Sequence, residues 1–117
     1  MTMESDLVTL LQVRCPRVHP LVAPLSTTRP YITWQHIGGR PLRFTENTAA
    51  NKRHSMVQLN VWAATMLDAM TLIRQLEDDL CASTAFAAVP DSAPIGQEHT
   101  ASETYGAQQD FSILATR

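Results

Sequence analysis

Charged residues are scarce in this chain: they make up 17% of its 117 residues, whereas about 25% is usual for a soluble protein. A thinly charged surface leaves more area that can be buried against a partner. The sequence also lacks an apolar run near the roughly 20 residues that a membrane-spanning helix needs, and its N-terminus carries acids where a signal peptide has basic residues. Its apolar fraction of 44% excludes wholesale disorder. We expect one soluble, intracellular domain that spans residues 1–117.

The residue types that build active sites are few and scattered. Cys15 and Cys81 have no CxxC spacing, and we expect two reduced, mostly buried thiols. The four histidines stand at no metal-ligand spacing, and no G-x-S-x-G elbow is present. Gly38-Gly39 lacks the later residues of a phosphate-binding loop, so it predicts a tight turn or bulge. We therefore expect no enzymatic activity, no cofactor and no metal.

A short helix is predicted at the N-terminus. Ser5 can cap it, and Leu7 and Leu11 fall on one face. It should end by Arg14, because Pro16 disfavours helical dihedrals at the residue before it. Four prolines between residues 16 and 30 then predict a linker without regular structure.

Residues 31–37 and 55–63 are rich in β-branched and aromatic residues and read as two strands. In the second strand, aliphatic residues alternate with larger polar or aromatic ones. One face of this strand is therefore expected to pack on a core, and the other to be partly exposed to solvent or covered by a partner. The partner-covered side chains are expected to be Gln58, Asn60 and Trp62.

The second half of the chain predicts a long helix and further strands. Thr65 begins the helix, and an apolar stripe follows at helical spacing: Met66, Ala69, Met70, Ile73, Leu76 and Leu80. Phe86 and Val89 should enter the core, and a final strand at 105–116 can pair with a short one near 94–99. These elements predict an α+β fold: a mostly antiparallel sheet of about four strands, two helices on one face, and a long β-hairpin arm.

That arm comprises about residues 38–54, between the first two strands. Connections this long are uncommon in compact domains and tend to be functional or disordered. It contains a basic and aromatic set: Arg40, Arg43, Phe44, Lys52, Arg53 and His54. Such a set can contact a phosphate backbone or an acidic protein surface. The alternative is that the arm binds no partner and is a solvent-exposed hairpin whose charges keep it soluble.

Charge is divided unequally along the sequence. Residues 1–60 have a net charge of +4, and residues 61–117 have a net charge of −6. A bipolar protein is suited to head-to-tail association with copies of itself. The alternative, which the sequence by itself favours, is that both halves interleave in one fold and the charges mix on its surface.

Three blocks of the sequence resemble the phage tail completion, or tail terminator, family of long-tailed phages and prophages. The first is PYITWQHI at 30–37, and the second is RHSMVQLNVWA at 53–63, followed by Thr65 and Asp68-Ala69. The third is DFSI at 110–113, which is similar to the family's last strand. The resemblance extends over most of residues 5–114.

The resemblance implies a structural protein that assembles as a ring, commonly of six subunits, and caps the finished tail tube. Its partners would be further copies of itself, the tail tube protein and the head-tail connector or stopper protein. DNA passes through without specific binding, and no membrane is involved. The protein would reside in the virion tail at its head-proximal end, after assembly in the host cytoplasm. The alternative is a small nucleic-acid-binding module that acts through the basic 40–54 arm.

Overall fold

The computed structural model describes residues 2–24, 27–39, 52–99 and 104–116. Within these residues lie two helices, α1 (Met3–Arg14) and α2 (Met66–Ala82). They also contain six strands: β1 (Val18–Pro20), β2 (Tyr31–Gly38), β3 (Lys52–Ala63), β4 (Ala87–Pro90), β5 (Ile95–His99) and β6 (Thr104–Thr116). The predicted α+β class is confirmed.

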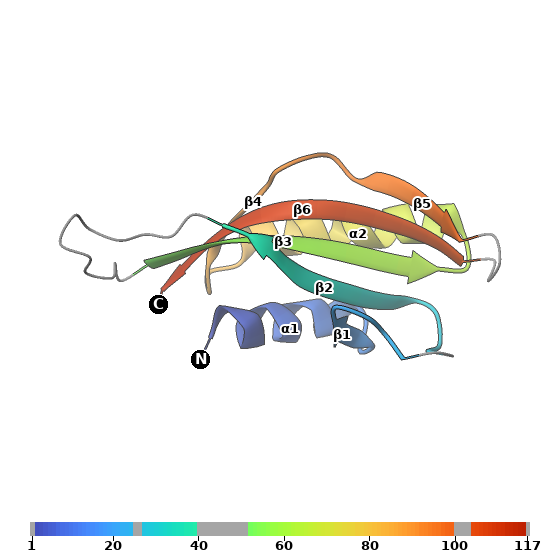
Figure 1. Cartoon of the computed structure of the whole chain (residues 1–117), viewed down its shortest axis with the longest axis horizontal. Helices are drawn as coiled ribbons and strands as arrows, with labels where there is room; N and C mark the ends of the chain where they lie inside the picture. Colours follow the sequence, from blue (N-terminus) through green and yellow to red (C-terminus); the bar gives the residue numbers. More distant parts are fainter. Residues whose placement is uncertain (1, 25–26, 40–51, 100–103, 117) are drawn as a thin grey trace.

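The six strands form one sheet in the order β1-β2-β3-β6-β4, and β5 also pairs with β6 (Figure 1). Its centre is the long antiparallel pair β3–β6, which keeps one register from Lys52 opposite Thr116 to Ala63 opposite Tyr105. β5 and β4 pair with successive parts of β6, so together they make one edge of the sheet. β1 makes the other edge.

The predicted number of about four strands was wrong, because the described sheet has six strands. The sheet is mostly antiparallel, as predicted, but one of its pairings is parallel. β1 pairs in parallel with β2, with Val18 opposite Ile32. The prolines were expected to forbid regular structure here, yet Pro20 ends a three-residue strand. Proline is tolerated at a sheet edge, where its missing N–H leaves no ladder bond unmade.

Both helices cover one face of the sheet, and the alternation predicted for the strands decides which side chains they bury. Val57, Leu59 and Val61 of β3 and Phe111 and Ile113 of β6 are fully buried. They form one core with buried residues of the helices, among them Leu7, Leu11, Ile73, Leu76 and Leu80.

In β4 the face that was predicted to be buried is the exposed one. Phe86 is buried, as predicted, but Val89 is 61% exposed and Ala88 is buried instead. Because side chains alternate along a strand, Phe86 and Ala88 point to the core and Val89 points away.

The helix caps were predicted correctly for α2 and wrongly for α1. The Thr65 hydroxyl accepts a hydrogen bond from the Asp68 backbone N–H at 3.1 Å. In α1 the cap is Thr2. The hydroxyl of Ser5, the third helical residue, accepts a hydrogen bond from the Thr2 N–H at 3.2 Å. Two hydroxyl residues in this reciprocal arrangement stabilise the first turn more than Ser5 alone could.

The Gly38-Gly39 pair forms the predicted bulge. The register between β2 and β3 shifts between His36 and Gly38, and the two glycines have φ values of 126° and 145°. Residues 40–51, which include most of the predicted arm, lie outside the described residues.

An ion pair between the helices predicts a pH-dependent stability. The Arg14 Nε lies 2.7 Å from Asp79 Oδ2, and Nη2 donates to Oδ1 at 3.0 Å. This bond lowers the pKa of Asp79 below its usual value. A carboxyl with a lowered pKa adds stability that is complete above its unfolded pKa, about 3.9, and is lost as the pH falls through the folded value.

We therefore expect Asp79→Asn to lower Tm by a few degrees at pH 7 and to make little difference near pH 2. Thermal unfolding followed by circular dichroism from pH 2 to pH 7 measures this. Asp78→Asn is the matched control, because it removes the same charge from an exposed side chain that has no ion pair with a described residue. Equal effects of both variants at pH 7 would show that the bond to Arg14 contributes nothing.

Candidate functional site

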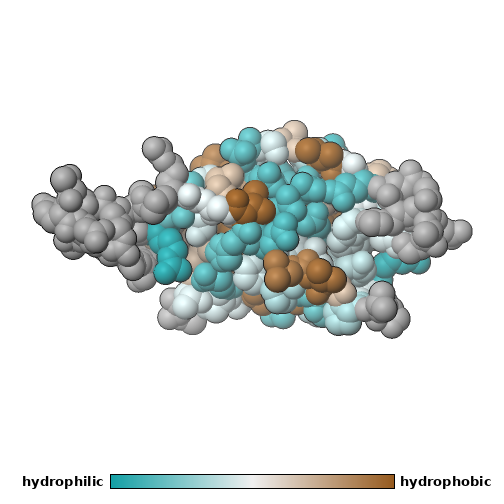
Figure 2. Space-filling model, viewed as in Figure 1, coloured by the Kyte–Doolittle hydropathy of each residue, from teal (hydrophilic) through white to brown (hydrophobic). Residues whose placement is uncertain are grey.

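The face of the sheet opposite the helices is open and carries a shallow groove. Hydrophilic residues cover most of this face, and hydrophobic residues form separate patches on it (Figure 2). The groove has a volume of about 430 Å³. Uncharged polar and aromatic side chains from β2, β3, β5 and β6 line it, among them Gln35, Gln58, Asn60, Trp62, Gln97 and Gln108. We call it the amide groove.

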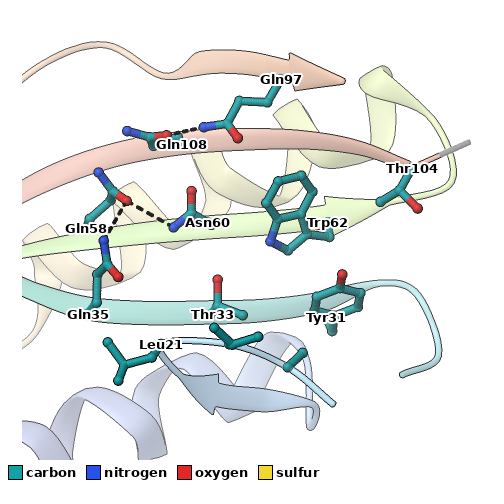
Figure 3. A pocket seen from close by; sticks show the side chains of 12 residues that line it. Leu21, Tyr31, Thr33, Gln35, Gln58, Asn60, Trp62, Gln97, Thr104 and Gln108 are labelled. Atoms are coloured by element: carbon teal, nitrogen blue, oxygen red, sulfur yellow. Dashed lines mark hydrogen bonds between the residues drawn. The ribbon is translucent and has the colours of Figure 1, made fainter. Parts of the chain in front are cut away.

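Amide side chains in the groove bond to one another, both within β3 and across strands (Figure 3). Gln58 Oε1 accepts from Gln35 Nε2 at 3.1 Å and from Asn60 Nδ2 at 3.3 Å. Gln97 Nε2 donates to Gln108 Oε1 on the β5 side of the groove. These bonds fix the amide orientations, while each amide keeps further donors and acceptors for a partner.

Trp62 is held at one end of the groove by the strand beside it. Gly106 lies directly opposite it in the β3–β6 register, and a Cβ on Gly106 would come within 2.6 Å of the indole ring. The ring therefore lies on the glycine backbone and is half-buried. Tyr31 faces it from β2, so two aromatic side chains with polar tips flank the amides.

The turn after β1 forms the wall of the groove on that edge. Leu21 and Val22 line the groove and are 66% and 78% exposed. Leu21 has a φ of 63°, which is unusual for a residue other than glycine. Its N–H donates to the Trp34 carbonyl at 2.8 Å, and the Val22 N–H donates to Pro20 at 2.7 Å. These bonds hold two aliphatic side chains outward in a strained turn.

The structure thus places the predicted interface residues in one groove. The predicted arm residues do not lie together: some are outside the described residues, and others point to opposite faces of the sheet. Gln58, Asn60 and Trp62 are all in the amide groove. Arg40, Arg43 and Phe44 lie outside the described residues, and Lys52 begins β3. Arg53 and His54 point to opposite faces, since Arg53 Nη1 lies 3.8 Å from Glu4 on α1 and His54 Nε2 lies 2.7 Å from Ser112 Oγ on the open face.

His36 of β2 contacts the same carboxylate of Glu4. Its Nε2 lies 3.3 Å from Glu4 Oε1, and its ring stands edge-on to Trp34 with centroids 5.8 Å apart. Glu4 therefore links α1 to the ends of both β2 and β3 nearest the arm.

Several groove residues were missed at the sequence level. Leu21 and Val22 were missed because the proline-rich segment was read as a linker, and Gln97 because its strand was too short to give a pattern. Gln108 could have been found: Phe111 and Ile113 face the core, so alternation places residue 108 on the opposite face. The same rule places Gln109 in the core, where its Nε2 donates to Glu77 at 2.5 Å and to the Ser92 carbonyl at 2.8 Å.

The chemistry of the groove suits binding rather than catalysis. Carboxamides neither exchange protons near neutral pH nor act as nucleophiles. The His54–Ser112 pair has the distance of a base and a nucleophile, but Ser112 lies between β3 and β4. The ladder there occupies the N–H groups that an oxyanion hole requires. Among the described residues, no three His, Cys, Asp or Glu side chains converge as metal ligands.

The two cysteines differ in environment. Cys15 is buried, whereas Cys81 is exposed, contrary to the expectation that both are mostly buried. Partial desolvation, followed by the charges of Glu77 and Asp78, raises the pKa of the Cys81 thiol. A raised pKa keeps the thiol protonated, which makes it a poor nucleophile.

Comparison with protein families gives a match over nearly the whole chain. Residues 3–115 match the family described as Tail completion protein gp17. The match includes both helices and every strand except the last residue of β6. No curated protein matches the chain significantly. In the part of the chain that the structure describes, neither helix has the length and apolar character to cross a membrane.

Proposed function

The chain belongs to the phage tail completion family and is a structural component of a phage tail, and we propose that it closes into a ring of six subunits. The ring caps the tail tube at the head-proximal end, stops its polymerisation and presents a surface to the head-tail connector protein. DNA passes through the ring without specific binding. Assembly takes place in the host cytoplasm, before the tail joins the head.

The open face of the sheet is the observation that supports a ring. It presents neutral amides and half-buried aromatic rings, and one neighbouring subunit covers Gln58, Asn60 and Trp62. Burying neutral amides costs less free energy than burying charges, provided that hydrogen bonds replace those to water. Trp and Tyr supply large contact areas with a polar tip, which is why they are frequent at interfaces.

The arm serves the remaining partners. Its basic residues Arg40, Arg43, Lys52 and Arg53, with Phe44 and His54, contact the tube protein or the connector protein. A tube-facing or connector-facing position keeps these charges away from the DNA. Arg53 is exposed and lies near Glu4, so this base of the arm has part of its charge balanced within the chain.

Trp62→Ala is expected to weaken subunit association by about 30-fold, because an interface tryptophan often contributes about 2 kcal/mol. Size-exclusion chromatography with light scattering gives the oligomer mass as a function of concentration. Leu67→Ala is the control, because Leu67 is 76% exposed on α2, on the other side of the sheet.

Negative-stain imaging with purified tube protein tests the capping role. Wild type should give rings and tubes of limited length, and Trp62→Ala should give longer tubes. A protein that stays monomeric and never limits tube length would contradict the proposal. Salt-dependent DNA binding by such a monomer would instead favour the nucleic-acid-binding alternative.

A further inference from the structure

We infer that the subunit contact is head-to-tail, with the β4–β5 edge of one copy docking on the β1 edge of the next. This inference rests on the proposed ring and names its two surfaces. The basic rim is defined here as Arg17, Leu21 and Val22. The acidic edge is defined as Val89, Asp91 and Ile95.

The two edges come from segments of opposite charge. From Leu7 to Thr45 the sequence contains no acidic residue, and from Gln75 to Thr116 it contains no lysine or arginine. The fold brings the two halves together in the middle, where β3 lies beside β6, but it leaves the edges segregated. The charge difference along the sequence thus becomes a charge difference across the sheet.

One charge on each edge has no compensating ion pair with another described residue. The Arg17 Nε donates to the Pro30 carbonyl at 2.9 Å, which fixes the guanidinium and leaves its Nη groups for a partner. Asp91 is exposed, and its backbone N–H is anchored to the Asp110 carbonyl at 2.8 Å. One hydrogen bond therefore fixes the Arg17 guanidinium, and another fixes the backbone that carries the Asp91 carboxylate.

Both edges also expose aliphatic side chains. Leu21 and Val22 on the rim are 66% and 78% exposed, and Val89 and Ile95 on the acidic edge are 61% and 57% exposed. Aliphatic groups together with one charge of opposite sign on each edge make the two edges complementary. No further strand pairs with the outer side of either edge within the described sheet.

A single copy cannot bring these two patches together. The strand order places β1 four strand spacings from β4, roughly 19 Å across the sheet, and Figure 1 shows them on opposite sides of the sheet. The complement of each patch therefore has to come from a second molecule. Two different surfaces that join identical subunits make a heterologous contact, which closes into a ring when the rotation allows. Leu21 and Val22 also wall the amide groove, so the neighbour that contacts them covers the groove as well.

Charge reversal on each edge tests the contact. Arg17→Glu alone and Asp91→Arg alone should each weaken association by about tenfold or more, because like charges then face each other. The double variant should regain association, since the charges again complement each other. An equal mixture of the single variants should also assemble, because alternate copies then match. Light scattering over a concentration series measures all four.

Two further variants distinguish a loss of the subunit contact from a loss of folding. Arg74→Glu reverses an exposed charge on α2, on the helix side, and should leave the oligomer unchanged. Val22→Glu tests the rim without disturbing the Arg17–Pro30 bond, and it should also weaken association. Circular dichroism and Tm confirm that each variant is folded.

The outcomes separate this inference from the proposed function. A wild-type protein that forms no oligomer, even with tube protein, overturns both. Rings that persist in all edge variants overturn only the head-to-tail contact and leave the capping role standing. Single variants that dissociate, with no recovery in the double variant or the mixture, also overturn it, because residues 17 and 91 then do not face each other.

Discussion

Phe111→Ala is expected to lower the free energy of unfolding by about 3–5 kcal/mol. Phe111 is fully buried in β6, between Val57 of β3 and Pro90 of β4, on the face that the helices cover. Removing the ring loses its transfer free energy and leaves a cavity, because a sheet held by strands on both sides cannot collapse into the space. Urea denaturation followed by circular dichroism measures the change.

Leu114→Ala is the matched control for this variant. Leu114 is in the same strand but 41% exposed on the open side, so its replacement should cost less than about 1.5 kcal/mol. All proteins must be compared at one low concentration, since association adds to apparent stability. Similar losses for both variants would mean that the core is not where the fold places it.

Gly39→Ala is expected to lower the free energy of unfolding by about 3 kcal/mol. Gly39 has a φ of 145°, which L-residues rarely adopt. An added Cβ would also lie 2.5 Å from the His54 carbonyl oxygen and 3.0 Å from Ser55 Cα. Both are backbone atoms of β3, so the clash displaces the strand itself where the predicted arm begins.

Gly38→Ala separates the two causes of this loss. Gly38 has a φ of 126°, but an added Cβ there would meet no atom within 4 Å. Its replacement should therefore cost only the backbone strain, about 1–2 kcal/mol. The difference between the two variants in urea denaturation measures the clash with β3. Equal losses would show that Gly39 is needed only for its dihedral angles.

Much of the site could be predicted from the residues of β3 themselves. The alternation of Val57, Leu59 and Val61 with Gln58, Asn60 and Trp62 separates a core face from an open face. The residues of β3 do not reveal which other strands contribute to the open face. The structure shows that amides from β5 and β6 continue this surface and that Gly106 supports the Trp62 ring. Gly106 and Gln108 lie more than forty positions from Trp62 along the chain, so no local pattern contains these contacts.

The sequence alone determined the features that depend on a few neighbouring residues. These are the α+β class, the apolar stripe of α2 and its Thr65 cap, the Gly38-Gly39 bulge and the buried face of β3. Only the tertiary structure decided that residues 18–20 pair in parallel with β2, that Val89 points outward, and that Arg17 and Asp91 stand on opposite edges. Dihedral preference and side-chain alternation act over a few residues, whereas strand order depends on which distant segments share a core.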